Sequence, residues 1–182
     1  MSIKKMFFVV VSMLVMLTGT CFAKVTLQDL NIGGVTLEQP LVKVVEKYGK
    51  PTDTQVVPPK GVNFVFIFDD VVMELHSYNS NLESAVVNRI TVDGLQNRNL
   101  IMSSGIGLGS TIDDVLNIYG KPDSIEDTEY CLLSKYYLTK KLEYRPAKVI
   151  KYNTTEGQSL AFYFINNKAC AITIGKPTAM VK

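Results

Sequence analysis

The stretch VTLEQPLVKVVEKYGKP (residues 35–51) is repeated further along the chain as IGLGSTIDDVLNIYGKP (residues 106–122). Both copies end on Tyr-Gly-Lys-Pro, and they align without a gap because the offset from Tyr48 to Tyr119 is 71 residues throughout. An internal repeat constrains the architecture before any local structure is assigned. We therefore expect two tandem units of one design.

Each copy has the apolar spacing of a short helix followed by a stop. In the second copy Ser110 and Thr111 offer an N-cap, Asp113 and Asp114 suit the first turn, and an i, i+3, i+4, i+7 stripe ends at Tyr119. A glycine just past the stripe and a proline two residues later end such a helix. The repeated motif is thus an aromatic anchor with a terminator: Tyr48, Gly49 and Pro51, then Tyr119, Gly120 and Pro122.

After each stop the apolar period changes to two, which is typical of strands. The predicted strands are 54–57, 62–68, 71–77 and 86–92 in the first half, and 131–138, 148–153, 159–165 and 168–174 in the second. Asp69-Asp70 and Asn166-Asn167 are suited to two-residue hairpin turns, because both residue types tolerate positive φ. The predicted fold class is α+β, with two tandem repeats that each hold a short helix and about four antiparallel strands.

The division of the chain follows from the repeat. Residues 1–23 read as a signal peptide, 24–95 as the first unit, 96–104 as a short connector and 105–182 as the second unit. Each unit alone has about 70 residues, a size at which one core is marginally stable. We expect the two units to pack against each other, because the connector is short and contains apolar residues.

The N-terminus predicts export. Lys4 and Lys5 precede an apolar run from 6 to 17, which is too short to span a bilayer, and small residues lead to a cleavage point between Ala23 and Lys24. The alternative is a lipoprotein signal in which Cys21 is lipidated, but Thr18-Gly19-Thr20 matches that pattern poorly. The expected location is the periplasm, the cell envelope or the outside of the cell.

The net charge of the chain argues against nucleic-acid binding. The full chain has 19 basic and 17 acidic side chains, and removal of the signal takes away two lysines and no acid, so the remainder is neutral. No second apolar stretch of spanning length follows residue 24. We therefore expect no nucleic-acid partner and no membrane span in the mature chain.

The pattern Ile-x-Leu-Gly-Ser-Thr-x-x-x-Val-x-x-x-Tyr-Gly-x-Pro at 106–122 resembles the helical entry motif of the small outer-membrane lipoprotein family SmpA/OmlA. It is also similar to the tandem units of β-lactamase inhibitor protein. The first copy departs from the pattern, because Glu38, Gln39 and Pro40 stand where the second has Gly109, Ser110 and Thr111. The resemblance implies an exported, non-catalytic, protein-binding module.

No catalytic, cofactor or metal site is expected. His76 is the only histidine, and its place in the predicted strand 71–77, on one face with Val72 and Glu74, favours a surface position. The carboxylate pairs Asp69-Asp70 and Asp113-Asp114 suit a turn and a helix start, not an acid/base pair across a cleft. An enzyme would have to use Glu74, His76 and a nearby hydroxyl.

Cys131 and Cys170 are the two cysteines left after signal removal, and both lie in the second unit. An isolated pair in an oxidising, exported setting is a candidate disulfide. The alternative is a buried thiol, because Cys170 shares a strand face with Ile172 and Ile174. The sequence leaves both readings open.

Aromatic residues are the strongest indication of a binding surface. The strand 62–68 is apolar on both faces, so something must cover the second face, either the other repeat or another protein. The candidate protein-binding residues are tyrosines, which suit interfaces because they are amphipathic: Tyr130, Tyr136, Tyr137, Tyr144 and Tyr152, with Tyr78 in the first unit.

The function expected from the sequence is therefore an exported, non-catalytic protein-binding module of the cell envelope that acts through aromatic-rich antiparallel sheets. A secreted inhibitor of a hydrolase and a binder of peptides or small molecules remain as alternatives. The expected partner is another protein, and no cofactor is implied.

Overall fold

The structure is a computed structural model that describes residues 25–95 and 100–175. The expected signal peptide, Cys21, the Ala23–Lys24 cleavage point and part of the connector lie outside these residues.

The described chain begins with three short elements: η1 (Leu27–Asp29), β1 (Asn31–Ile32) and β2 (Val35–Thr36). The first half continues with α2 (Leu41–Tyr48), β3 (Asp53–Val56), β4 (Val62–Phe68), β5 (Val71–Ser77) and β6 (Arg89–Asp93). The second half has α3 (Ile112–Tyr119), β7 (Ser124–Cys131), α4 (Leu133–Thr139), β8 (Tyr144–Asn153), β9 (Ser159–Ile165) and β10 (Lys168–Gly175).

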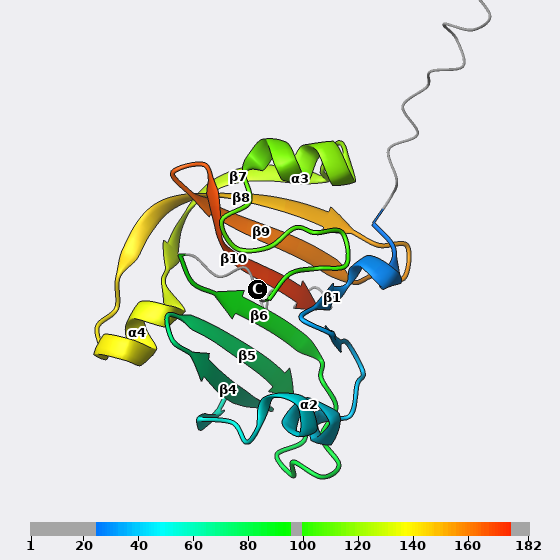
Figure 1. The fold of residues 1–182 in the computed structure, drawn as a ribbon, viewed down its shortest axis with the longest axis vertical. Coiled ribbons are helices and arrows are strands. Elements are labelled where there is room, and N and C mark those ends of the chain that lie inside the picture. Colours follow the sequence, from blue (N-terminus) through cyan, green and yellow to red (C-terminus); the bar gives the residue numbers. More distant parts are fainter. Residues whose placement is uncertain (1–24, 96–99, 176–182) are drawn as a thin grey trace, which may run out of the picture.

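Eight of the strands form one antiparallel sheet in the order β3-β4-β5-β6-β10-β9-β8-β7 (Figure 1). The last strand of the first half, β6, pairs with the last strand of the second, β10, over five residue pairs that include Thr91 with Thr173. The shorter edge of the sheet is β3 and the longer is β7. The α+β class with a large antiparallel sheet is confirmed.

Both predicted helices are present, and both end where the motif places the stop. α2 ends at Tyr48 and α3 at Tyr119, each followed by a glycine with positive φ. The two starts differ. α3 has a capping box in which the N–H of Thr111 donates to the Asp114 carboxylate at 2.8 Å, whereas α2 begins after Pro40 with no side-chain cap.

The main core lies between the sheet and these two helices, which sit on the same face of the sheet (Figure 1). Phe64 and Phe66 of β4 and Phe162 and Phe164 of β9 are buried in it, and Phe68 at the end of β4 is partly buried against it. Tyr119 packs its ring against Phe162 with centroids 5.8 Å apart, and its hydroxyl lies 2.6 Å from the Ser104 hydroxyl. The tyrosine of the repeated motif is thus a core anchor.

Both predicted hairpin turns are confirmed. Asp69 has φ 51° between β4 and β5, and Asn166 and Asn167 have φ 51° and 63° between β9 and β10. In the second turn two consecutive residues have positive φ, a geometry that matches the right-handed twist of the flanking strands. Strands 62–68 and 159–165 have the predicted bounds.

The predicted strand 131–138 is wrong. The strand in this part of the chain is β7, which ends at Cys131, and residues Leu133–Thr139 form the helix α4. β7 reads SIEDTEYC, which has little apolar pattern because an edge strand exposed to water does not need one and is protected by charge. The apolar residues that follow belong to a helix that buries one face, including Tyr137, against the sheet.

We predict that Gly49→Ala destabilises the protein by about 1–3 kcal/mol, although a Cβ there would meet nothing within 4 Å. Gly49 has φ 82° and ψ −174°, a region that side chains with a Cβ avoid. Urea unfolding measures the change. Lys50→Ala at the exposed neighbouring position is the control, and equal midpoints for the two variants would contradict the strain argument.

Candidate interaction surface

The face of the sheet opposite α2 and α3 carries α4. Here Val65 of β4 and Val72 of β5 are fully buried against Tyr137, with Leu133 and Tyr136 beside them. The second apolar face of the strand 62–68 is therefore covered by a helix from the other half of the chain. Figure 1 shows α4 at the end of the sheet near β4 and β5, away from the other helices.

The N-terminus of α4 is capped from β6. The residue before the helix, Leu132, offers no side-chain acceptor. Instead the Asp93 carboxylate accepts from the N–H of Ser134 at 2.7 Å and from the N–H of Leu133 at 3.2 Å. Asp93 is fully buried, and this burial raises the pKa of its carboxyl, an effect that the hydrogen bonds from α4 oppose. A carboxylate from the first half thus satisfies two N–H groups that α4 cannot satisfy itself.

A second carboxylate holds the body of α4. The Tyr137 hydroxyl donates to Glu74 Oε1 at 2.6 Å, and Asn63 Nδ2 approaches Glu74 Oε2 at 3.4 Å. Burial raises the pKa of Glu74, while the bond from Tyr137 and the charge of Arg89 lower it. The pKa of Tyr137 is raised, first by burial and then by Glu74. α4 is therefore fixed at two points on the first half.

His76 is buried, with 8% of its surface exposed, so the predicted surface position is wrong. Its Nδ1 lies 3.0 Å from Asn63 Oδ1, which can only accept, so Nδ1 carries the hydrogen. Burial lowers the pKa of the imidazole, and the charge of Arg89 adds to the effect. The ring packs edge-on against Tyr78 at 5.1 Å. Sequence alone missed this because strand alternation does not tell which face a distant helix or loop covers.

The candidate tyrosines do not form one exposed face. Tyr137 and Tyr152 are buried, and the Tyr152 hydroxyl donates to the Gly120 carbonyl at 3.0 Å. Tyr136 is half-buried, and Tyr130 is half-buried against Tyr163 with ring centroids 4.6 Å apart. Tyr144, at 60% exposure, is the one of the five that is open to solvent. In the first half Tyr78 is also exposed.

The candidate disulfide is not formed, and Cys131 and Cys170 are free thiols. The sheet order places β8 and β9 between their strands. Two intervening strands separate positions by about 14 Å, more than a disulfide can span. Leu132, not Cys131, packs against Cys170. Burial raises the pKa of Cys170 to about 12, and its thiol donates to the Tyr163 carbonyl at 3.3 Å.

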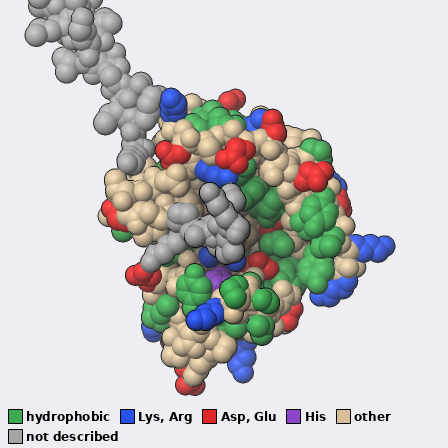
Figure 2. All heavy atoms as spheres, turned by 180° about the vertical axis from the view of Figure 1, so that it is seen from behind, with side chains coloured by type: hydrophobic (Ala, Val, Ile, Leu, Met, Phe, Trp, Pro, Cys, Tyr) green, Lys and Arg blue, Asp and Glu red, His purple; other side chains and the backbone are tan. Residues whose placement is uncertain are grey.

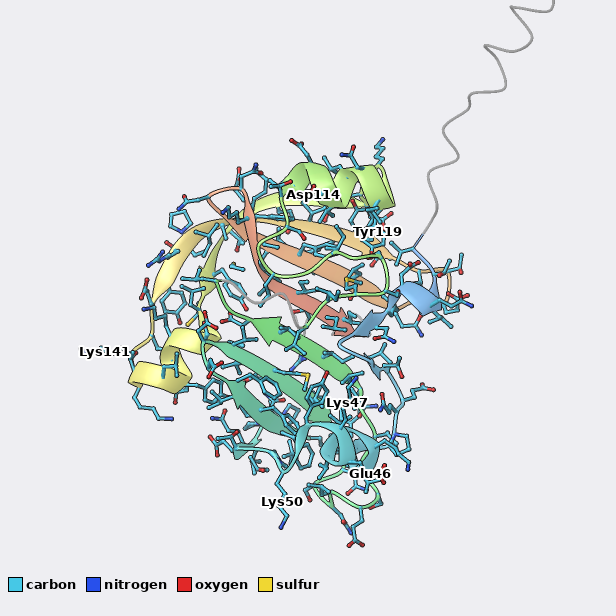
Figure 3. The ribbon with its side chains drawn as sticks, in the orientation of Figure 1. Glu46, Lys47, Lys50, Asp114, Tyr119 and Lys141 are labelled. Atoms are coloured by element: carbon cyan, nitrogen blue, oxygen red, sulfur yellow. The ribbon has the colours of Figure 1, made fainter. Side chains whose placement is uncertain are left out.

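The end of α4 and the loop after it expose residues 138–142 and Tyr144. We call residues 135–144 the α4 tip; within it Tyr137 is buried, and Lys135, Tyr136 and Glu143 are half-buried. The tip carries Leu138 and Leu142, which are 53% and 63% exposed, beside Tyr144. Three lysines accompany them: Lys135, Lys140 and Lys141. Figure 3 shows Lys141 directed away from the sheet. The sequence pattern predicted a strand over 131–138 and therefore did not indicate these exposed residues.

Within the described parts of the chain, no group of three or more histidine, cysteine or carboxylate side chains is placed to hold a metal ion. In the same residues no helix is long and apolar enough to cross a membrane.

No protein-family model matches this chain, and no curated protein sequence matches it. Solved structures with a similar course of the chain include a cysteine-rich secretory protein from Staphylococcus aureus, with TM-score 0.47 and 10% identity over 78% of this chain and 43% of that one. A DUF4309 family protein from Bacillus subtilis has TM-score 0.46 and 10% identity, over 79% and 82% of the two chains. An extracellular protein containing an SCP domain from Bacillus anthracis has TM-score 0.49 and 10% identity, over 78% and 44%. This chain thus spans less than half of the first and third. Likeness at this level carries no conclusion about function.

We predict that Asp93→Ala destabilises the protein by roughly 1–3 kcal/mol, because the N–H groups of Leu133 and Ser134 lose their acceptor. Urea unfolding measures the loss, and faster hydrogen exchange at Ser134 locates it. Asp70→Ala, in an exposed turn, is the control and should stay within about 0.5 kcal/mol of the parent. An Asp93→Ala protein as stable as this control would contradict the capping role.

The raised pKa values of Asp93 and Glu74 predict a pH dependence. Both groups bind a proton more tightly in the folded chain. The stability from this source is present below the ordinary carboxyl pKa of about 4 and is lost as the pH rises through the raised values. As the pH rises from the ordinary carboxyl pKa through the raised pKa values, we expect the urea midpoint of the parent protein to fall. It should fall more steeply than that of the double variant Asp93→Asn, Glu74→Gln, whose two side chains do not titrate in this pH range. Identical slopes for the two proteins would be the contrary result.

Proposed function

We propose that the protein is an exported, non-catalytic protein-binding module built from two tandem units. The repeat at 35–51 and 106–122 supports the duplication. The strand order does so too, because β6, β5, β4 and β3 follow one another outward on one side of the β6–β10 pair, as β10, β9, β8 and β7 do on the other. In each half a helix precedes four strands, and α4 is the addition in the second half. The resemblance of the repeat motif to SmpA/OmlA and to β-lactamase inhibitor protein is consistent with binding as the role.

The observation that carries this proposal is the one-sided layering of the sheet. α2 and α3 lie on one face, while among the described elements α4 alone packs on the other, at one end. The ladder between β6 and β10 makes this second face continuous across both halves. A broad sheet face of this kind suits a macromolecule better than a small molecule, which needs a deep concave site.

The side chains near the middle of this face suit a protein contact. Thr91 and Thr173 form a cross-strand pair with hydroxyl oxygens 3.4 Å apart, and both are half-buried. Asn63 and Glu74 are half-buried on neighbouring strands, and Tyr78 is exposed beyond the end of β5. The mixture of polar groups with an exposed tyrosine is typical of protein interfaces. We call this area the open face.

A non-catalytic role is supported by the partners of His76. Its Nδ1 is bonded to the amide of Asn63, and the near carboxylate, Glu74, is engaged by Tyr137. General base catalysis would call for a histidine oriented by a carboxylate beside a hydroxyl. The export proposal comes from the N-terminal segment, with cleavage at Ala23–Lys24 preferred over lipidation at Cys21. An envelope-assembly accessory and a secreted hydrolase inhibitor both fit this proposal.

Affinity capture from the cell-envelope fraction tests the proposal. The processed protein should retain a protein partner, and Tyr78→Ala and Thr173→Arg should each weaken retention by roughly tenfold or more, because both change the open face. Asp113→Arg on α3 introduces an arginine on the opposite side and should leave retention unchanged.

Unfolding midpoints of all variants show whether any loss of retention reflects unfolding. If no protein is retained above background, the binding proposal is wrong. If Asp113→Arg reduces retention as much as the open-face variants do, the partner uses a different surface.

A further inference from the structure

The α4 tip combines exposed apolar side chains with positive charge. Leu138, Leu142 and Tyr144 are each more than half exposed in this segment. Figure 2 shows hydrophobic side chains gathered on the side where α4 lies, with a lysine or arginine side chain extending at their margin. Single exposed leucines are ordinary, whereas a gathered patch beside charged residues marks an interaction site.

The lysines of the tip have no acidic partner. In residues 25–95 and 100–175, ion pairs occupy Lys43, Lys148, Lys151 and Arg145, but none involves Lys135, Lys140 or Lys141. The acid within the tip, Glu143, is bonded to Arg145. Lys140 lies over the rings of Tyr136 and Tyr137, 5.7 and 5.6 Å from their centroids. The tip therefore has a local positive charge, although the chain without its signal is neutral.

We propose that the α4 tip docks on an anionic lipid surface. Leu138, Leu142 and Tyr144 would enter the headgroup region, and the lysines would lie against lipid phosphates. An apolar patch surrounded by basic residues is the composition of segments that lie in the membrane interface. Each lysine near an anionic leaflet adds attraction, and aromatic rings favour the same depth.

The residue types favour lipid over an acidic protein. Recognition of individual carboxylates on a protein favours arginine, whose planar guanidinium makes paired hydrogen bonds, whereas a lysine is a compact point charge that suits a diffuse negative surface. The three cations of the tip are all lysine.

The attachment of α4 makes the tip a rigid contact. The bonds from Asp93 to the start of the helix and from Tyr137 to Glu74 fix α4 to the sheet. A tip on a fixed helix would set the orientation of the sheet relative to the membrane. This proposal needs only that the protein is exported, and it does not depend on a protein partner at the open face.

Vesicle flotation of the processed protein tests the proposal. Vesicles of phosphatidylglycerol with phosphatidylcholine should bind the protein, and vesicles of phosphatidylcholine alone should bind it far less. Binding should weaken in high salt. The double variant Lys135→Gln, Lys141→Gln should bind roughly 25-fold less tightly, about fivefold for each lysine. Leu138→Ser, Leu142→Ser should also reduce binding, by roughly tenfold or more.

The matched control is Lys50→Gln, Lys121→Gln, which removes the same charge from the two copies of Tyr-Gly-Lys-Pro, and it should bind like the parent. Circular dichroism confirms that each variant is folded. Equal binding to neutral and anionic vesicles overturns the proposal. The proposal is also overturned if a tip variant binds anionic vesicles as tightly as the control variant does. A third contrary result is that the tip crosslinks to a protein while neither kind of vesicle binds the parent.

Discussion

The backbone ladder between β6 and β10 is the interaction on which the rest of the structure depends. It joins the last strand of each half and turns two four-stranded halves into one eight-stranded sheet. Without it each half would leave a long strand edge exposed, and each would have a core of marginal size. Because the ladder aligns the two halves, α2 and α3 come to lie on the same face.

The ladder also creates the site at which α4 docks. Asp93 is the last residue of β6 and pairs with Ala171 of β10. Its carboxylate faces the side opposite the main core and receives the first N–H groups of α4. A seven-residue helix has little stability of its own, so α4 depends on this cap, on the Tyr137–Glu74 bond and on the apolar contact with Val65 and Val72. The two halves are thus tied by backbone pairing and by side chains.

This arrangement separates two surfaces. α4 packs on one end of the second sheet face, beside the open face, while Leu138 and Leu142 of its tip are more than half exposed and Lys141 points away from the sheet. The open face is the basis of the proposed protein binding, and the tip is the basis of the proposed lipid contact. Because α4 is fixed at two points, the position of one surface determines the position of the other.

The sequence by itself determined the helices α2 and α3, the hairpin turns and most strands. These depend on local periodicity, on glycine after Tyr48 and Tyr119, and on residues that accept positive φ, all of which act between near neighbours. It did not reveal α4, because β7 is a polar edge strand with little pattern and the cap of α4 is supplied by Asp93, 40 residues earlier. It likewise could not tell that His76, Tyr137 and Tyr152 are buried, or that two strands separate Cys131 from Cys170. Those properties depend on which distant segments meet, and only the tertiary structure decides that.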